Sequence, residues 1–540
     1  MAASQMAGMI LNSARWSAYG DALGFIGELA DSAGLRHRMG SVDIRNTVPW
    51  RRRIGGRFGV EVMLPAGCYS DDTQLRLSTS RAIRGDGHFD VEALARVELP
   101  VWQAYALGAG TGTKAAARNL TNPSTNWFSN FFTHQNARYI DGGGNGAAMR
   151  IQPHVWAARD RSKPETFVGD VIRNAIITHG HPRGILGAVF HALCLASSLQ
   201  NRSIPDPHRW QNFANCVDLV MTTIYRDSEL STFWLPTWNE RSKVSFEDLA
   251  KEVCNECIAD LNTVDRFLSD SPEKSYASMV ESIGGLRRET AGSGTKTAII
   301  ATALAWMAQN ANPIRAIRLA ANLLESDTDT IASMTGALLG AVSTELVPGE
   351  VLDIAYIDSE SRRLHAVSTD DATRSFDYPE LGSWVPPRTQ LDAVVQIEGQ
   401  LVVAGLGIAE PGSEEFRAKD GDSSWQWMRL EFGQSILSKR RNVLRTITRR
   451  ESNGDHRQLP QHGQQLSLNS ELRPSAHRPR KAKILRSVDE LTQEAIKAGF
   501  DPLLIGSHIL ELSEADAGIE LAIAYASIIA KAKAARRKQR

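Results

Sequence analysis

The sequence predicts an all-α helical bundle, followed by a small β-rich module and a C-terminal helical segment. Apolar residues recur at the 3.6-residue spacing of helices through most of the first 375 residues. Alternating strand patterns are scarce in that part, and the sequence changes character only after it. Because the chain has 540 residues, longer than a single core usually grows, more than one domain is expected.

Helical spacing is clearest in seven segments of the first part. Many of them are rich in Ala, Gly and Ser, which let helix backbones approach one another closely and therefore suit a compact bundle. The segments are Met6–Leu23, Val91–Leu107, Val171–Ile177, Gly187–Ser198, Phe246–Phe267, Thr297–Gln309 and Pro313–Leu324. They place the helical domain within residues 1–375.

A small β-rich module is predicted over residues 376–437. Ala393–Ile397 and Leu401–Gly405 form a hairpin pattern around a glycine-containing turn. A further strand is predicted at Trp425–Phe432, where Trp425 and Trp427 would share one face of a small core.

Two more segments are predicted after this module. Residues 438–484 are basic and polar with few aliphatic side chains, which is typical of a disordered linker. Residues 485–540 return to a helical pattern. The basic character of the linker leaves nucleic-acid binding open as an alternative for this region.

Composition limits the classes of protein to which the chain can belong. Lys plus Arg and Asp plus Glu balance at 61 each, so net charge does not indicate a polyanion binder. The 5 cysteines are scattered, which favours a reducing compartment over a disulfide framework. Neither a signal-peptide pattern nor a run of 18 apolar residues occurs. We therefore expect a cytoplasmic protein without a membrane partner.

Two short acidic clusters, Ser70-Asp71-Asp72-Thr73 and Asp327-Thr328-Asp329-Thr330, lie about 250 residues apart. The second is followed directly by an apolar, small-residue helix pattern that belongs in a core. Ionised carboxylates beside a buried helix need cations, because they repel one another in a dry site. Oxygen-only clusters favour magnesium or manganese over zinc. If the fold brings the two clusters together, they form a two-metal hydrolytic site.

Each cluster alone allows a plainer interpretation. Ser-Asp-Asp-Thr suits the N-terminus of a helix, where carboxylates meet the helix dipole. Asp327-Thr-Asp-Thr is similar to an aspartate-nucleophile phosphatase motif, but that motif needs a preceding β-strand and Ile314–Leu324 has a helical pattern. The presence of both clusters favours metal ligation.

Four further motifs accompany the acidic clusters. Gly20-Asp21-Ala22-Leu23-Gly24 is expected to close the first helix, with Glu28 shortly after it. Gly142–Arg150 is a glycine-rich turn whose free N–H groups could bind phosphate or sugar oxygens. Thr178-His179-Gly180-His181-Pro182 precedes an apolar helix, and Gly292-Ser293-Gly294-Thr295 opens the helix that leads to the second cluster.

In this order and spacing the motifs resemble the ADP-ribosylglycohydrolase family, over roughly residues 6–345. The matching elements are Gly20-Asp-Ala-Leu-Gly, Ser70-Asp-Asp-Thr, Asn145-Gly-Ala-Ala-Met-Arg, Thr178-His-Gly-His-Pro and Asp327-Thr-Asp-Thr with the Gly-Ala-Leu-Leu-Gly-Ala helix after it. The resemblance implies an all-α fold, two Mg²⁺ (or Mn²⁺) ions, and hydrolysis of the bond joining ADP-ribose to its acceptor. The implied partner is an ADP-ribosylated protein or other macromolecule.

Carried onto this sequence, the resemblance implies roles for individual residues. The implied metal ligands are Ser70, Asp71, Asp72, Asp327, Asp329 and Thr330. The implied catalytic residues are Glu28, Asp72 and Asp329, with Glu28 as a ligand or a water-positioning base. The residues implied to bind substrate are Gly143, Gly144, Asn145 and Gly146 at the ribose and diphosphate, and His179 at the border of the pocket.

Two positions depart from the family pattern. Ser70 replaces the commoner Thr and keeps the hydroxyl. Some members have a catalytic Asp three residues before the Asn, whereas this chain has Gly142 there and Asp141 one residue earlier. Whether Asp141 takes part in catalysis is therefore open, with Glu28 or a metal-bound water as the replacement.

The leading hypothesis is a hydrolase that removes ADP-ribose from a modified macromolecule. The alternative is a non-catalytic ADP-ribose-binding protein or an immunity-type protein that blocks a toxin. A third hypothesis keeps the hydrolysis but moves the substrate to nucleic acid, positioned by the basic C-terminal region. The acceptor depends on pocket walls that the sequence alone does not define.

Overall fold

The computed structural model describes residues 2–56, 59–134, 137–419, 421–447, 486–513, 521–523, 525–526 and 528–529. The chain divides into two compact units, Met1–Gln461 and His462–Arg540. Most of the predicted linker 438–484 lies outside the described residues, so both its disorder and its proposed contact with nucleic acid stay predictions.

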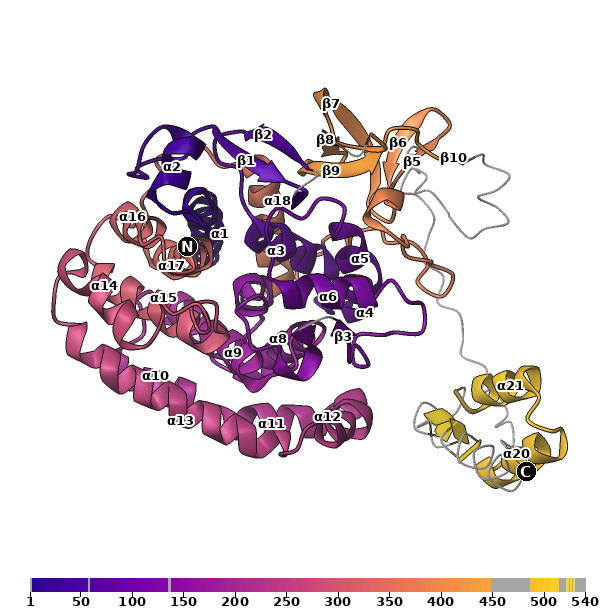
Figure 1. The fold of residues 1–540 in the computed structure, drawn as a ribbon. Coiled ribbons are helices and arrows are strands. Elements are labelled where there is room, and N and C mark those ends of the chain that lie inside the picture. The colour runs from indigo at the N-terminus through magenta and orange to yellow at the C-terminus, as the bar shows by residue number, and fades with distance from the viewer. Residues whose placement is uncertain are drawn as a thin grey trace, which may run out of the picture. The chain divides into compact units, whose positions relative to one another are not determined.

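The first unit is mostly helical and carries one small sheet module near its C-terminal end, which confirms the predicted fold class (Figure 1). Its α-helices are α1 (Ala2–Gly27), α2 (Ser32–Met39), α3 (Asp71–Ala82), α4 (Val91–Ala93), α5 (Leu99–Trp102), α6 (Thr111–Asn119), α7 (Gln152–Trp156), α8 (Val168–Ile176), α9 (Pro182–Asn201), α10 (Pro207–Ala214), α11 (Val217–Arg226), α12 (Leu235–Arg241), α13 (Phe246–Val264), α14 (Pro272–Ser282), α15 (Gly294–Ala308), α16 (Ile314–Asn322), α17 (Thr328–Val342) and α18 (Ile354–Ser368). Short 3₁₀ or π turns are η2 (Leu94–Glu98), η3 (Tyr139–Asp141), η4 (Ala148–Arg150), η5 (Pro164–Thr166), η6 (Leu230–Trp234), η7 (Asp265–Phe267) and η8 (Gln390–Asp392).

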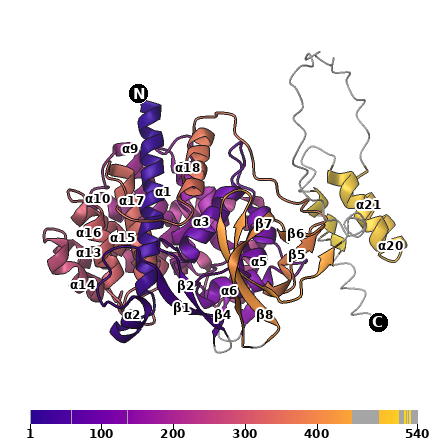
Figure 2. The same ribbon diagram turned by 90° about the horizontal axis from the view of Figure 1, so that it is seen from above.

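Helices α1 and α17 run side by side, and glycines on both allow their backbones to touch (Figures 1 and 2). A Cβ atom added to Gly24 would overlap the carbonyl oxygen of Thr328, and one added to Gly336 would overlap that of Trp16. Only glycine therefore fits at these positions. The contact fixes the start of α17, where the second acidic cluster lies, against the later turns of α1.

The Gly20–Gly24 motif lies inside α1, which continues to Gly27. The expectation that this motif closes the first helix was therefore wrong. A glycine that ends a helix and a glycine that lets a neighbouring helix approach have the same signature in a single sequence.

A hairpin that the sequence analysis did not predict follows α2. Strands β1 (Trp50–Ile54) and β2 (Val60–Leu64) pair antiparallel, with Trp50 opposite Leu64. In β1 the buried Trp50 is followed by Arg51, Arg52 and Arg53, and this run of charge hid the alternation that predicts a strand.

The C-terminal part of the first unit is a six-stranded sheet in the order β10-β5-β6-β7-β8-β9. Its strands are β5 (Val394–Ile397), β6 (Gln400–Val403), β7 (Gly407–Arg417), β8 (Ser423–Leu430), β9 (Ser435–Arg441) and β10 (Thr446–Ile447). A two-stranded ladder, β3 (Thr133–His134) with β4 (Ala137–Arg138), lies elsewhere in the first unit. The predicted hairpin is confirmed as β5–β6.

The sheet packs on the helices through a continuous core that includes Trp425, Met428 and Leu437. The buried guanidinium of Arg81, on the last turn of α3, donates to Gln434 at 2.6 Å and so connects the sheet to the helix that carries the first acidic cluster. Strands β9 and β10 continue the sheet to Ile447, past the predicted boundary at 437. The predicted boundaries at 375 and 484 stay predictions.

Helix α9 has the length and apolar composition that a membrane span requires, but 94% of the relevant window is buried inside the protein. It packs against α15 and α8 as a core helix. In the second unit, α20 (Val488–Lys497) and α21 (Pro502–Ser513) form a small core of their own around Leu491 and Leu512, as the predicted helical segment requires.

Candidate active site

The first acidic cluster forms the start of α3, and α1 holds it in place. Ser70 is the N-cap, and its hydroxyl accepts a hydrogen bond from the N–H of Asp72 at 3.2 Å. The carboxylate of Asp21, fully buried on α1, accepts from the backbone N–H groups of Ser70 and Thr73, both at 2.8 Å. Asp21 therefore positions the acidic turn.

The two acidic clusters meet in the structure. The Thr330 hydroxyl, on the first turn of α17, donates to Oδ1 of Asp72 at 3.3 Å. Both side chains are almost completely buried. Helix α1 makes this contact possible. Its residue Asp21 accepts a hydrogen bond from the start of α3, and its residue Gly24 packs against the backbone at the start of α17. The fold thus brings together the two clusters that the sequence analysis singled out.

Four carboxyl groups in this site have raised pKa values, and burial is the largest cause for each: Asp21, Asp71, Asp72 and Asp329. Burial, followed by the charges of Glu28 and Asp21, raises the pKa of Asp71 to about 8. Burial and neighbouring carboxylates also raise the pKa of Asp72 and of Asp329 well above the usual range. Carboxyl groups buried this close together ionise readily only when a positive charge lies beside them, so the site favours the binding of a cation.

The donor chemistry fits a hard divalent cation. Oδ2 of Asp72 is buried and has no hydrogen-bond partner among the described residues. Oδ1 of Asp71 accepts a hydrogen bond from the N–H of Ala109 at 2.7 Å, and Oδ2 of Asp327 accepts one from the amide of Asn145 at 2.9 Å. Across the described ranges, no group of three or more His, Cys, Asp or Glu side chains is already arranged to hold an ion. The remaining carboxylate oxygens and the two hydroxyls are nevertheless the ligands that Mg²⁺ and Mn²⁺ prefer.

Glu28 borders the carboxyl groups but is paired with a cation. Its Oε2 accepts from Nη2 of Arg52, on β1, at 2.8 Å, and both side chains are less than a fifth exposed (18% and 14%). The Arg52 guanidinium also lies 4.1 Å from the ring centroid of Phe25. The charge of Glu28 contributes to the raised pKa values of Asp71 and Asp329, which places it beside the cluster. Sequence reasoning missed Arg52, whose only signal was its place in a run of three arginines.

Asn145 connects the glycine-rich turn to the second acidic cluster. Its amide Nδ2 donates to Asp327 and to the hydroxyl of Thr297, at 2.9 and 3.1 Å. Its backbone N–H donates to the carbonyl of Gly292 at 2.9 Å. The sequence analysis expected the N–H groups of this turn to be free for a ligand. The N–H of Asn145 is not free, because the turn pairs with the loop that opens α15.

His179 packs against the same turn. A Cβ atom on Gly146 would lie 3.0 Å from Cε1 of the imidazole, and one on Gly144 would lie 3.6 Å from Nε2. The hydroxyl of Thr178 hydrogen-bonds Nδ1 at 2.7 Å. Burial, and then the charge of Arg150, lowers the pKa of His179 to about 3. The imidazole is therefore neutral near pH 7, and the hydroxyl of Thr178 holds it in place.

Two residues near the turn lie apart from these contacts. A Cβ atom on Gly143 would approach Arg183 and His181, at 3.2 and 3.3 Å, rather than His179. Asp141 is more than half exposed and pairs with Arg138 at 2.6 Å. The structure thus does not place Asp141 with the buried carboxyl groups.

A glycine-rich loop ahead of α6 completes the surroundings of Asp71, and sequence reasoning missed it. The N–H of Ala109 donates to Asp71, and a Cβ on Gly108, whose φ is +116°, would overlap that carboxylate. A Cβ on Gly146 would lie 2.9 Å from the hydroxyl of Thr113, on α6. The loop therefore contacts the acidic cluster, and helix α6 directly after it contacts the glycine-rich turn. Its signal in the sequence is the alternation of glycines immediately before a helix.

Comparison with known proteins supplies the family. The family model described as ADP-ribosylglycohydrolase matches residues 17–366. A solved structure described as an ADP-ribosylglycohydrolase-related protein complex is similar at 18% sequence identity and a TM-score of 0.43, over 68% of this chain and 99% of that chain. No curated protein matches this chain. Since the family match spans well over half of the chain and contains both acidic clusters, the glycine-rich turn and His179, this protein belongs to the ADP-ribosylglycohydrolase family.

Proposed function

We propose that this protein is a metal-dependent hydrolase that cleaves the glycosidic bond between ADP-ribose and a modified macromolecule, and so reverses ADP-ribosylation. Family membership suggests hydrolysis of ADP-ribose linkages. The observation that carries the proposal is the hydrogen bond from Thr330 to Asp72, which joins the two acidic clusters. The full set of oxygen donors supports an enzyme over a non-catalytic ADP-ribose-binding protein, which has little need for them.

Two Mg²⁺ ions, or Mn²⁺ in their place, are the proposed cofactors. The residues proposed to hold them are Ser70, Asp71, Asp72, Asp327, Asp329 and Thr330. When bound, such ions would neutralise the buried carboxylates and lower the pKa of a coordinated water.

The side chains around the cluster have separate roles in this proposal. Glu28, oriented by Arg52, positions the attacking water, and the carboxylates stabilise positive charge as it develops on the anomeric carbon. Asn145 fixes the orientation of Asp327 through its amide. The ribose and diphosphate are proposed to bind at Gly143, Gly144, Asn145 and Gly146, and neutral His179 supports Gly144 and Gly146 from behind.

A panel of ADP-ribosylated acceptors tests the proposal. Purified protein is mixed with arginine-, serine- and nucleobase-linked ADP-ribose, and free ADP-ribose is measured with Mg²⁺, with chelator, and after Mg²⁺ or Mn²⁺ is restored. We expect release from at least one acceptor, loss with chelator and recovery with metal. D72N serves as a folded, inactive control. Retention of intact ADP-ribosylated acceptor without release, on every member of the panel, would instead identify a non-catalytic binding protein.

A further inference from the structure

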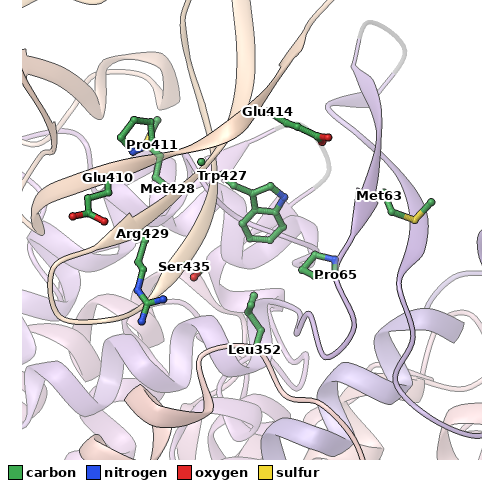
Figure 3. A pocket seen from close by; sticks show the side chains of 11 residues that line it. Met63, Pro65, Leu352, Glu410, Pro411, Glu414, Trp427, Met428, Arg429 and Ser435 are labelled. Atoms are coloured by element: carbon green, nitrogen blue, oxygen red, sulfur yellow. The ribbon is translucent and has the colours of Figure 1, made fainter.

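A pocket lies outside the acidic site, where the end of the β1–β2 hairpin, the segment before α18 and the C-terminal sheet meet (Figure 3). Its volume is ≈ 450 Å³, which is within the range of sites that hold small molecules or single side chains. Figure 3 shows the indole of Trp427 directed toward Pro65 and Leu352. Met63, which is 49% exposed, adds to the apolar side of the pocket.

The walls of the pocket are fixed by hydrogen bonds. The carboxylate of Asp353 accepts from the N–H and the hydroxyl of Ser435, both at 2.7 Å, and from the hydroxyl of Tyr69 at 2.8 Å. The N–H of Leu352 donates to the carbonyl of Gly67 at 3.0 Å. The sheet is therefore hydrogen-bonded to the segment before α18, and that segment is hydrogen-bonded to Gly67 and Tyr69, which lead directly into Ser70.

A β-bulge shapes the rim of the pocket. The register between β7 and β8 shifts between Pro411 and Glu415, so that residues 412–414 of β7 stand opposite Trp427 alone. Bulges re-aim side chains and are over-represented beside binding sites. Here the bulge carries Glu414 to the edge of the pocket above the indole (Figure 3).

The charge at this rim is negative. The carboxylates of Glu410 and Glu414 are exposed and have no hydrogen-bond or ion-pair partner within the part of the chain that the structure describes. Arg429 lies opposite Glu410 in the strand register, so Glu414 remains as the excess charge. The ring of Trp425 lies 4.7 Å from the ammonium of Lys439, whereas that of Trp427 has no cation over it among the described residues.

An apolar floor, an open indole face and a carboxylate rim match one kind of ligand, the long aliphatic side chain with a cationic end. Lysine and arginine bury their stems on apolar surface, and their charged groups bind Trp faces and carboxylates. Phosphate groups are repelled by the same rim, so a nucleic-acid backbone is a poor match.

The pocket also lies close to the acidic site. Pro65 lines the pocket and Ser70 caps α3. The two residues are five positions apart in the chain, so their Cα atoms are at most about 18 Å apart. An extended peptide covers that distance in about five or six residues. One short polypeptide can therefore occupy both places.

We propose that this pocket binds a lysine or arginine side chain of the polypeptide whose ADP-ribosylated residue enters the acidic site. The identity of that polypeptide rests on the proposed hydrolase function, whereas the binding of a basic side chain does not. The substrate class is thus a protein with a basic residue within about five positions of the modified one.

The first test measures binding alone. The full chain is labelled with 5-fluorotryptophan, and the ¹⁹F resonance that disappears in W427F is assigned to Trp427. We expect a saturable shift of that resonance with the peptides acetyl-Gly-Arg-Gly-amide and acetyl-Gly-Lys-Gly-amide, and at least five-fold weaker binding in the E410Q/E414Q double variant. The matched peptide acetyl-Gly-Glu-Gly-amide and AMP serve as controls. No saturable shift with the basic peptides, an equal response to the glutamate peptide, or tighter binding of AMP would overturn the proposal.

The second test measures catalysis. We expect E410Q/E414Q to raise KM about ten-fold for an ADP-ribosylated basic peptide, with kcat unchanged, and to leave hydrolysis of free ADP-ribosyl-arginine unaltered. E431Q, an exposed glutamate on the turn between β8 and β9, is the matched control and should behave as wild type. If wild type hydrolyses the peptide and the double variant has the same KM, this inference fails alone. If wild type hydrolyses nothing, the proposed function fails and the peptide titration still decides the pocket.

Discussion

The hydroxyl of Thr330 lies 3.3 Å from the carboxylate of Asp72, although 258 positions separate the two residues in the chain. Helix α1 makes this meeting possible because it contacts both partners' helices. Asp21 on α1 accepts from the first turn of α3, and Gly24 on α1 admits the backbone at the start of α17. One helix thus acts as the common support for the two halves of the acidic site.

Replacing Thr330 tests that contact directly. T330V removes the hydroxyl that reaches Asp72 and that is proposed to bind metal, whereas T330S keeps it. We expect T330V to lower kcat or metal affinity about 10–100-fold and T330S to remain near wild type. Steady-state rates measured across a Mg²⁺ titration separate the two effects. Wild-type behaviour of T330V would show that the hydroxyl has no part in the site.

The packing of α1 on α17 gives a prediction about stability. In G24A the new methyl group would overlap the Thr328 carbonyl, so we expect a loss of about 1–3 kcal/mol in the free energy of unfolding. G8A is the matched control, because a Cβ on Gly8, in the same helix, meets no atom within 4 Å. That variant should be neutral or up to about 1 kcal/mol more stable. Urea denaturation of both variants measures the difference, and equal stabilities would contradict the close approach of the helices.

The fold class could be predicted from the helical spacing of apolar residues. The meeting of the two acidic clusters could also be predicted, because carboxylates beside an apolar helix are a local signal with few physical explanations. The sequence did not predict the partner of Glu28, since the pairing with Arg52 exists only once the β1–β2 hairpin folds against α1. The loop ahead of α6 escaped notice for a similar reason. Its glycines indicate a turn, and only the folded chain shows that Gly108 makes room for the carboxylate of Asp71.

Glu28 and Asp141 were the two candidates for an additional catalytic carboxylate, and their surroundings predict different outcomes. E28Q should lower kcat by about 10²–10⁴-fold, because Glu28 adjoins the buried carboxyl groups and is the proposed water-positioning base. D141N should leave kcat unchanged, since Asp141 pairs with Arg138 on the surface. Both rates are measured on ADP-ribosyl-arginine, with circular dichroism to verify folding. A comparable loss in D141N would return Asp141 to the mechanism.

The raised pKa of Asp71 predicts how the metal-free protein responds to pH. Its carboxyl group has a pKa of about 8 in the folded protein against 3.8 ordinarily, because burial and then the charges of Glu28 and Asp21 disfavour ionisation. Between these values the folded state keeps a proton that the unfolded chain releases. The stability associated with this group is therefore complete below pH 4 and is lost as the pH rises toward 8.

D71N removes this titration and keeps the oxygen that accepts from the N–H of Ala109. In chelator we expect wild type and D71N to melt at similar temperatures near pH 4, and D71N to melt a few degrees higher at pH 8. Mg²⁺ should raise the melting temperature of wild type at pH 8 more than that of D71N, because the variant lacks one proposed ligand charge. Melting curves at several pH values, with and without Mg²⁺, measure both effects without an activity assay. If the difference in melting temperature between wild type and D71N does not vary with pH, Asp71 ionises freely in the folded protein. The raised pKa of Asp71 would then no longer support a cation-binding site.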